Sequence, residues 1–273
     1  MKRTLRIPDR LRRALPAPWR RRIRTWVTEI PWRLRDAIPD TRDHLRDPET
    51  RLPPARLRRR VSKTSSRLEF ESAGARVAAD VMRAFEASRR AGREYRRWLD
   101  FGCGSGRIER HVTRLAGGRE VYGADVDGEA ISWLAPRRPA GRFLVIDSRP
   151  PTPFPSSFFD AIYVISVFTH FDEAAEGVWL AELVRLLAPG GLLIASTLSP
   201  NLTFERPDLT ESQHRELQAT GFLFAPGKSC FNEQTAFATR ARLESVWGAM
   251  LEFRFFEEHG LARYQDLSVW EKP

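Results

Sequence analysis

A glycine-rich run, Asp100 to Gly106 with the sequence DFGCGSG, is the part of the chain best suited to bind a ligand. It directly follows an apolar segment with strand character and directly precedes a helical pattern. In that context glycines let backbone amides approach a ligand closely, and the start of the helix opens toward it. The spacing is G-x-G-x-G, and Arg107 stands where the dinucleotide pattern G-x-G-x-x-G has its third glycine. The run therefore suits a nucleotide-like ligand. Arg107 makes NAD less favoured without excluding it, and an ordinary turn between a strand and a helix can also carry several glycines.

An acidic residue, Asp125, ends the next predicted strand, about twenty residues after the glycine run. A carboxylate at that place can accept hydrogen bonds from both hydroxyls of a ribose. Asp127 is the alternative ligand, although an acid at the start of a helix is also favoured for structural reasons. We prefer Asp125, because the end of a parallel strand lies over the ligand cleft.

His170 is the best candidate for a general base, since it follows the fourth predicted strand at the mouth of the cleft. An imidazole titrates near neutral pH, which suits the removal of a proton from a nucleophile. A structural interpretation competes with this one. In it, His170 packs against or caps the helix that begins near Asp172.

Strands and helices alternate through the middle of the chain and place these residues. Strands are expected at 98–100, 120–125, 142–147, 159–166 and 192–196, with helices at 69–91, 108–115, 129–134 and 172–187. Pro189-Gly190-Gly191 is expected to stop the last of these helices. The order predicts an α/β fold with a doubly wound, Rossmann-like and mostly parallel sheet.

The C-terminal third departs from this alternation. Thr210 and Gln213 form a capping-box pattern for a helix that runs to about Ala219, and another helix is expected over 240–250. Late strands at 251–256 and 267–270 predict an antiparallel hairpin at one edge of the sheet. The aromatic segment 201–232 is expected to be irregular, within an acceptor-lid insertion near 199–238; surface packing would explain the same aromatics.

The net charge of +10 is concentrated in residues 1–60, which hold an excess of twelve positive charges, while residues 61–273 carry −2. We expect 1–60 to form a basic segment broken by prolines and 61–273 to form the main domain. The amphipathic basic pattern at 19–30 suits three roles: covering the domain, resting on an anionic membrane surface, or gripping a phosphate-rich partner.

Cys103 and Cys230 are the only cysteines, which excludes a disulfide framework and a thiolate zinc site, and no metal is expected. The longest apolar stretch, 158–171, is too short to span a bilayer, and no secretory signal is apparent. A cytoplasmic location follows as the expectation, with residues 1–60 allowing peripheral membrane contact.

The sequence resembles the class I S-adenosylmethionine-dependent methyltransferase family through four segments in the family's order. Leu99 to Arg107 is similar to its first motif, and Val121 to Asp125 to its second strand. Val145 to Ser148, ahead of a proline-rich turn, is similar to the segment that cups adenine, and Arg185 to Gly191 to the turn before strand five. These signals cover residues 96–198. Phe255 to Lys272, with Tyr264-Gln-Asp-Leu267, resembles a bacterial subgroup found in glycan and natural-product gene clusters.

The resemblance implies the class I methyltransferase fold, S-adenosylmethionine as cofactor, and a set of cofactor contacts. Asp100 would orient the loop and meet the cofactor's amino group, and the loop residues would approach its methionine part. Asp125 would bind the ribose, and Ser166 would lie near the methionine carboxylate or the transferred methyl. The remaining implied contacts are the loop residues Gly102, Cys103, Gly104 and Gly106 and the adenine contacts Val126, Asp147 and Ser148.

The expected reaction is methyl transfer to an oxygen, or a nitrogen, of a small molecule or glycan. One alternative is a nucleic-acid methyltransferase that uses residues 1–60 as a basic arm. No Asn-Pro-Pro-Tyr motif follows the fourth strand, so a nucleic-acid partner is not expected. The other alternative is a non-catalytic scaffold or adaptor that keeps the cofactor site.

Overall fold

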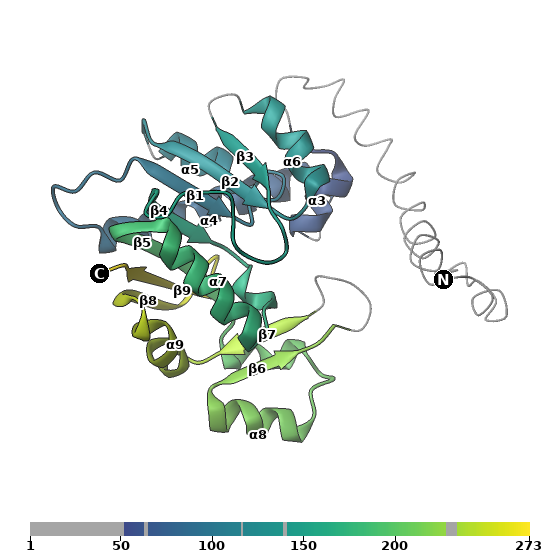
Figure 1. Ribbon diagram of the computed structural model, residues 1–273. Coiled ribbons are helices and arrows are strands. Elements are labelled where there is room, and N and C mark those ends of the chain that lie inside the picture. The colour runs from purple at the N-terminus through teal and green to yellow at the C-terminus, as the bar shows by residue number, and fades with distance from the viewer. Residues whose placement is uncertain (1–51, 63–64, 116, 139–140, 228–233) are drawn as a thin grey trace, which may run out of the picture. The chain divides into compact units, whose positions relative to one another are not determined.

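A computed structural model describes residues 52–62, 65–115, 117–138, 141–227 and 234–273 (Figure 1). The chain divides into two compact units, Met1–Phe70 and Glu71–Pro273. In the first, helix α3 (Ala55–Ser62) is tied to its flanks by Arg58, whose guanidinium donates to the carbonyls of Pro53 and Ser65 at 2.6 to 2.9 Å. The helix expected at 19–30 lies outside the described residues, and the domain boundary expected after residue 60 stays a prediction.

A seven-stranded sheet organises the second unit, in the order β3-β2-β1-β4-β5-β9-β8 (Figure 1). Strands β1 to β5 run parallel to one another, and β9 runs antiparallel to β5 and β8. The strands are β1 (Arg97–Phe101), β2 (Glu120–Asp125), β3 (Arg142–Val145), β4 (Phe159–Val164), β5 (Leu187–Thr197), β8 (Glu252–Leu261) and β9 (Gln265–Glu271). The predicted parallel sheet with an antiparallel C-terminal hairpin is confirmed.

The helices begin where the sequence supplies capping side chains. Asp127 and Asp172 accept hydrogen bonds from backbone amides at the starts of α6 and α7. The predicted capping box is confirmed, since Thr210 and Gln213 bond reciprocally at the start of α8. The helices are α4 (Arg67–Ser88), α5 (Glu109–Leu115), α6 (Gly128–Leu134), α7 (Glu173–Leu186), α8 (Glu211–Thr220) and α9 (Arg240–Val246). No helix of the described part is long and apolar enough to cross a membrane.

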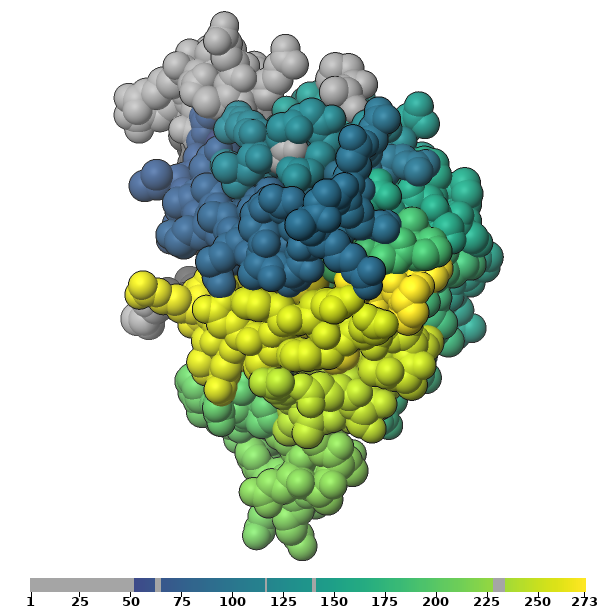
Figure 2. All heavy atoms as spheres, turned by 90° about the vertical axis from the view of Figure 1, so that its left-hand side faces the viewer, coloured from purple at the N-terminus to yellow at the C-terminus, as the bar shows by residue number. Residues whose placement is uncertain are grey.

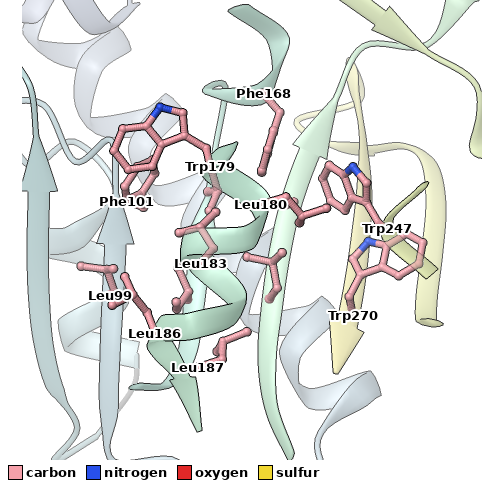
Figure 3. Packing of buried hydrophobic residues seen from close by; sticks show 14 of the residues in the cluster. Leu99, Phe101, Phe168, Trp179, Leu180, Leu183, Leu186, Leu187, Trp247 and Trp270 are labelled. Carbon is pink, nitrogen blue, oxygen red and sulfur yellow. The ribbon is translucent and has the colours of Figure 1, made fainter. Parts of the chain in front are cut away.

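Alternate strand residues pack against different helices, as expected for a sheet covered on both faces. On one face Leu99 and Phe101 pack with Trp179 of α7, and the same cluster extends to Trp247 and Trp270 (Figure 3). On the other face Trp98, Tyr163 and Phe85 of α4 belong to a second cluster. Burial of these large side chains on both faces fixes the sheet, and with it the strand ends that carry the site.

Two expectations about the local structure were wrong. Helix α7 ends at Leu186, and strand β5 already begins at Leu187, so Pro189 to Gly191 lie within that strand rather than forming a separate helix stop. Besides the predicted helix α8, the segment expected to be irregular contains the 3-10 helix η3 (Pro200–Glu205) and strand β6 (Phe222–Ala225). Strand β6 pairs antiparallel with β7 (Thr235–Ala238) in a separate two-stranded sheet.

Candidate cofactor-binding and active site

Strand β1 lies between β2 and β4, so the carboxyl ends of these three strands meet at one edge of the sheet. In register, Asp100 lies beside Gly123 on one side and Tyr163 on the other. The loops that follow these strands carry most of the predicted site residues. Ligands of open α/β sheets bind outside the carboxyl ends of the strands, so this edge is the candidate site.

Two glycines of the run are required by space as well as by backbone conformation. Gly102 has φ +83°, and a Cβ placed on it would lie 2.4 Å from Cγ2 of Val167. Gly106 has φ +76°, and a Cβ there would lie 2.7 Å from a methyl group of Leu134 in α6. Only glycine allows both the conformation and the close approach at these positions. The loop thus lies tightly between the segment after β4 and helix α6.

Cys103 fills the core beneath the loop with its side chain. Its Sγ lies 2.9 Å from where a Cβ on Gly123 would be, and it clusters with Leu134 and Phe143. Burial raises the pKa of the Cys103 thiol well above its ordinary value, which makes it a poor nucleophile. Contact with a cofactor is therefore open only to its backbone, and the predicted contact is restricted to that part of the residue.

The carboxylate of Asp125 lies directly against the loop. Its Oδ2 accepts a hydrogen bond from the amide of Gly104 at 2.6 Å, and its Oδ1 accepts one from the amide of Asp127 at 2.8 Å. Burial raises the pKa of Asp125, and these backbone amides counteract part of the rise. Asp127 is engaged as the N-cap of α6, with amides at 3.1 and 3.2 Å from its Oδ1. The geometry favours Asp125 over Asp127 as the ribose ligand.

Asp100 is buried at the end of β1, and its Oδ2 has no hydrogen-bond partner among the described residues. Burial raises its pKa well above the ordinary value, and the Tyr163 hydroxyl and the Arg107 guanidinium offset only part of this rise. A buried carboxylate oxygen without a donor is costly unless a ligand supplies one. The expected contact with a cofactor amino group fits this oxygen.

The predicted adenine contacts lie at the ends of β2 and β3. Val126 is 44% exposed although it is apolar, and Asp147 and Ser148 are exposed just beyond Val145. Residues 145–147 and 151–153 line a cavity of about 400 Å³. An exposed apolar side chain beside an exposed acid and a cavity provides the surface and the acceptor that an adenine ring needs.

Ser166 lies just past β4 in a left-handed conformation, with φ 58°. Its amide donates to Oγ of Ser196 at 2.8 Å, and its Oγ lies 2.9 Å from Nε2 and 3.1 Å from Oε1 of Gln265. A non-glycine residue in this region persists only where its surroundings hold it there. Ser196 and Gln265, to which the sequence assigned no role in the site, provide that support from β5 and β9.

His170 ends the 3-10 helix η2 (Phe168–His170), directly after the Ser166 turn. Its Nδ1 lies 2.7 Å from the carbonyl oxygen of Gln234, and the side-chain amide of Gln234 donates to the His170 carbonyl at 2.7 Å. Since a carbonyl only accepts, Nδ1 carries the hydrogen, and the neutral ring has its lone pair on Nε2. Asp172 caps α7 at 2.8 Å without His170, so the capping interpretation of His170 is not needed.

Three buried serine and threonine hydroxyls at the same strand ends also have no hydrogen-bond partner within the described ranges. They belong to Ser105 in the glycine loop, Thr169 in η2 and Thr197 at the end of β5. No sequence pattern singled them out, because serine and threonine are common in loops of every kind. These hydroxyls, the unpartnered Oδ2 of Asp100 and the closely packed glycines Gly102 and Gly106 together fit a bound polar ligand such as S-adenosylmethionine.

Comparison with known proteins agrees with this fit. The family described as "Methyltransferase domain" matches residues 99–195. The uncharacterized methyltransferase YdaC of Bacillus subtilis is 30% identical over 130 residues, which cover 45% of this chain and 70% of YdaC. The ubiquinone biosynthesis O-methyltransferase of Bradyrhizobium sp. is 33% identical over 108 residues, which cover 38% of this chain but only 41% of that enzyme.

A solved structure shows the same fold with a cofactor product bound. The 1,6-didemethyltoxoflavin-N1-methyltransferase of Burkholderia thailandensis, solved with its substrate and S-adenosylhomocysteine, has a TM-score of 0.52 at 18% identity. The match covers 74% of this chain and 79% of that one. The chain is a member of the class I S-adenosylmethionine-dependent methyltransferases, and the glycine run and the Asp125 loop form its candidate cofactor site.

Proposed function

We propose that the chain methylates an oxygen of a small molecule or glycan, with His170 as the general base. The similarity to a ubiquinone biosynthesis O-methyltransferase supports an oxygen acceptor. The observation that carries the proposal is the hydrogen bond from Nδ1 of His170 to the Gln234 carbonyl at 2.7 Å. It favours the tautomer whose Nε2 can accept a proton.

The need for a base distinguishes oxygen from nitrogen acceptors. When bound, S-adenosylmethionine supplies a methyl group made electrophilic by the sulfonium charge. A hydroxyl that attacks this methyl must lose its proton, whereas a neutral amine attacks through its lone pair. Gln234 holds the His170 ring through the carbonyl and fixes the His170 backbone through its own amide. A ring that is oriented through Nδ1, on a backbone that is also fixed, is suited to receive the hydroxyl proton on Nε2.

The acceptor side of the site is proposed to lie under the segment 199–238. This segment contributes η3, α8, β6 and β7, and Gln234 stands immediately before β7. It therefore connects the proposed lid directly to the proposed base. A cytoplasmic location, with residues 1–60 contacting an anionic surface, completes the proposal.

The test is methyl transfer from S-adenosylmethionine to a panel of phenols, sugar alcohols and amines, with cofactor binding measured separately by calorimetry. We expect turnover of hydroxyl acceptors and a loss of about 10²- to 10⁴-fold in kcat for His170→Ala, at unchanged cofactor affinity. His259→Asn, on strand β8 outside the proposed lid, is the control and should keep full activity, since asparagine tolerates the left-handed backbone at this position. Transfer to amines alone, with His170→Ala fully active, would overturn both the acceptor class and the base.

A further inference from the structure

A second cavity opens at the amino-terminal ends of β1 and β2, opposite to the strand ends that carry the candidate site. It has a volume of about 430 Å³ and is lined by the segment that leads into β1 and the turn that leads into β2. The lining residues are Arg89, Arg93, Glu94, Tyr95, Arg96, Gly117, Gly118 and Arg119. In Figure 2 the blue segment that leads into β1 faces the viewer, above the yellow C-terminal strands. The candidate methyl-transfer site lies at the other ends of the same strands.

Positive charge is concentrated around this cavity. Four of its eight lining residues are arginines and one is an acid, Glu94. Residues 89–97 contain five arginines, although residues 61–273 as a whole carry a net charge of −2. A concave surface lined by one sign of charge focuses the electrostatic potential and attracts ions of the opposite sign. The cavity is therefore suited to an anion.

Arg93 is held in place without an acidic partner among the described residues. Its guanidinium carbon lies 5.3 Å from the centre of the Tyr95 ring, and a terminal nitrogen lies 2.6 Å from where a Cβ on Gly190 would be. Its Nε is buried and has no hydrogen-bond partner. A guanidinium fixed by stacking holds its planar set of donors in one orientation, which suits paired contacts between its terminal nitrogens and the oxygens of an anion.

The neighbouring arginines can add to such a contact. Arg119 is positioned over Phe85 and Trp98, at 5.1 and 5.2 Å from the ring centres. Arg96 has a loose and exposed ion pair with Glu120 at 3.8 Å. Pairs of that kind contribute little and are readily exchanged for a stronger anion. The cavity thus offers several donors around one fixed guanidinium.

We propose that this cavity binds the phosphate group of a phosphorylated polyol, with Arg93 as the central ligand. Arginine recognises phosphate oxygens through paired hydrogen bonds. A cavity of about 430 Å³ is larger than a phosphate group alone needs, so the ligand carries a further polar portion. Glu94, the one acidic side chain of the lining, can accept hydrogen bonds from hydroxyls of that portion. The ligand is a soluble phosphorylated polyol or the head group of a glycerol-based phospholipid.

The full-length protein tests this proposal with two probes, glycerol phosphate in solution and vesicles of phosphatidylglycerol, each at low salt. Arg93→Gln should weaken binding by at least about tenfold, as expected from the loss of a charged hydrogen-bond partner. Arg76→Gln removes the same charge from an exposed position on α4 and should bind as the parent does. Inorganic phosphate should compete with both probes.

The arms of the experiment separate the two sources of the phosphate. If Arg93→Gln weakens the binding of glycerol phosphate but not the binding of vesicles, the ligand is a soluble phosphorylated polyol. If Arg93→Gln weakens only the binding of vesicles, the ligand is a lipid head group. Binding of both probes that is equal in the parent, Arg93→Gln and Arg76→Gln would overturn the proposal. Thermal unfolding of each variant confirms that the comparison concerns folded protein. S-adenosylmethionine affinity should not change in Arg93→Gln, because the two sites lie at opposite ends of the strands.

Discussion

The carboxylate of Asp125 joins the two loops of the cofactor site, since Oδ2 accepts from the Gly104 amide at 2.6 Å and Oδ1 from the Asp127 amide at 2.8 Å. Each oxygen keeps a second lone pair that can accept from a ribose hydroxyl. One side chain thereby fixes the glycine loop and the start of α6 while it offers two acceptors to the ligand. Asp125 is therefore a structural residue whose carboxylate is also placed to bind the ligand.

Asp125→Asn should lower S-adenosylmethionine affinity by about 10- to 100-fold, because the amide nitrogen would point a donor at groups that are themselves donors. The matched control is Asp127→Asn, which keeps an equally good N-cap and should bind the cofactor almost as the parent does. Calorimetric titration of the three proteins gives the comparison. A loss of affinity in Asp127→Asn with none in Asp125→Asn would assign the ribose to Asp127 instead.

Gly102→Ala should destabilise the fold by a few kcal/mol and abolish cofactor binding, because the methyl group meets Val167 as well as an unfavourable φ. Gly92→Ala is the control for φ alone. Gly92 has φ +77° with open space around it, so about 1 kcal/mol is expected there. Chemical denaturation gives both values. Adding Val167→Ala to Gly102→Ala should recover part of the lost stability; no recovery would mean that the contact with Val167 is unimportant.

The sheet and its glycine loop could be predicted because each strand is marked in the sequence by local signals. The strand at Glu120 to Asp125 is found at its predicted bounds, and the capping box at Thr210 has its expected geometry. Strands β6 and β7 were missed because each has only four residues and neither alternates apolar with polar side chains. Their pairing with each other depends on tertiary structure, which a local pattern does not contain.

The residues of the candidate site could likewise be predicted where local sequence patterns mark them, but not where contacts between distant parts of the chain bring them together. Asp125 and the glycines are recognisable because they lie within one βαβ segment. Gln234 and Gln265 contact His170 and Ser166 from 64 and 99 residues away, so neither spacing nor periodicity could indicate them. The hidden side chain of Cys103 was likewise not predictable, because a loop pattern does not tell which of its residues turn inward.

Asp100→Asn should stabilise the protein without cofactor at neutral pH while it weakens cofactor binding. Burial raises the pKa of this carboxyl well above 3.8 in the folded state. The protein therefore loses stability as the pH rises from 3.8 toward that raised pKa, because the unfolded chain gives up the proton first. The neutral amide avoids this loss. Between pH 4 and pH 8, the unfolding temperature of the variant should rise relative to that of the parent as the pH increases. Asp147→Asn, at an exposed carboxyl, should show no such gain.

Glu182 should stabilise, in a pH-dependent manner, the loop 151–153 that lines the cavity after β3. It accepts hydrogen bonds at 2.7 Å from the amide and the hydroxyl of Thr152, which lines that cavity, and it pairs with Arg185. Although burial acts in the opposite direction, the hydrogen bonds from Arg185 and Thr152 lower the pKa of Glu182 from 4.5 to about 2.

The stability that Glu182 contributes is therefore complete above pH 4.5 and is lost as the pH falls toward 2. Glu182→Gln should lower the free energy of unfolding by roughly 2–3 kcal/mol at pH 7, and its difference from the parent should shrink with acidification. Glu120→Gln removes an exposed carboxylate with a loose partner and should change stability by less than about 0.5 kcal/mol. Urea unfolding at pH 7, 4.5 and 3.5 measures all three proteins. A difference that is constant with pH would show that the Glu182 charge does not hold this loop.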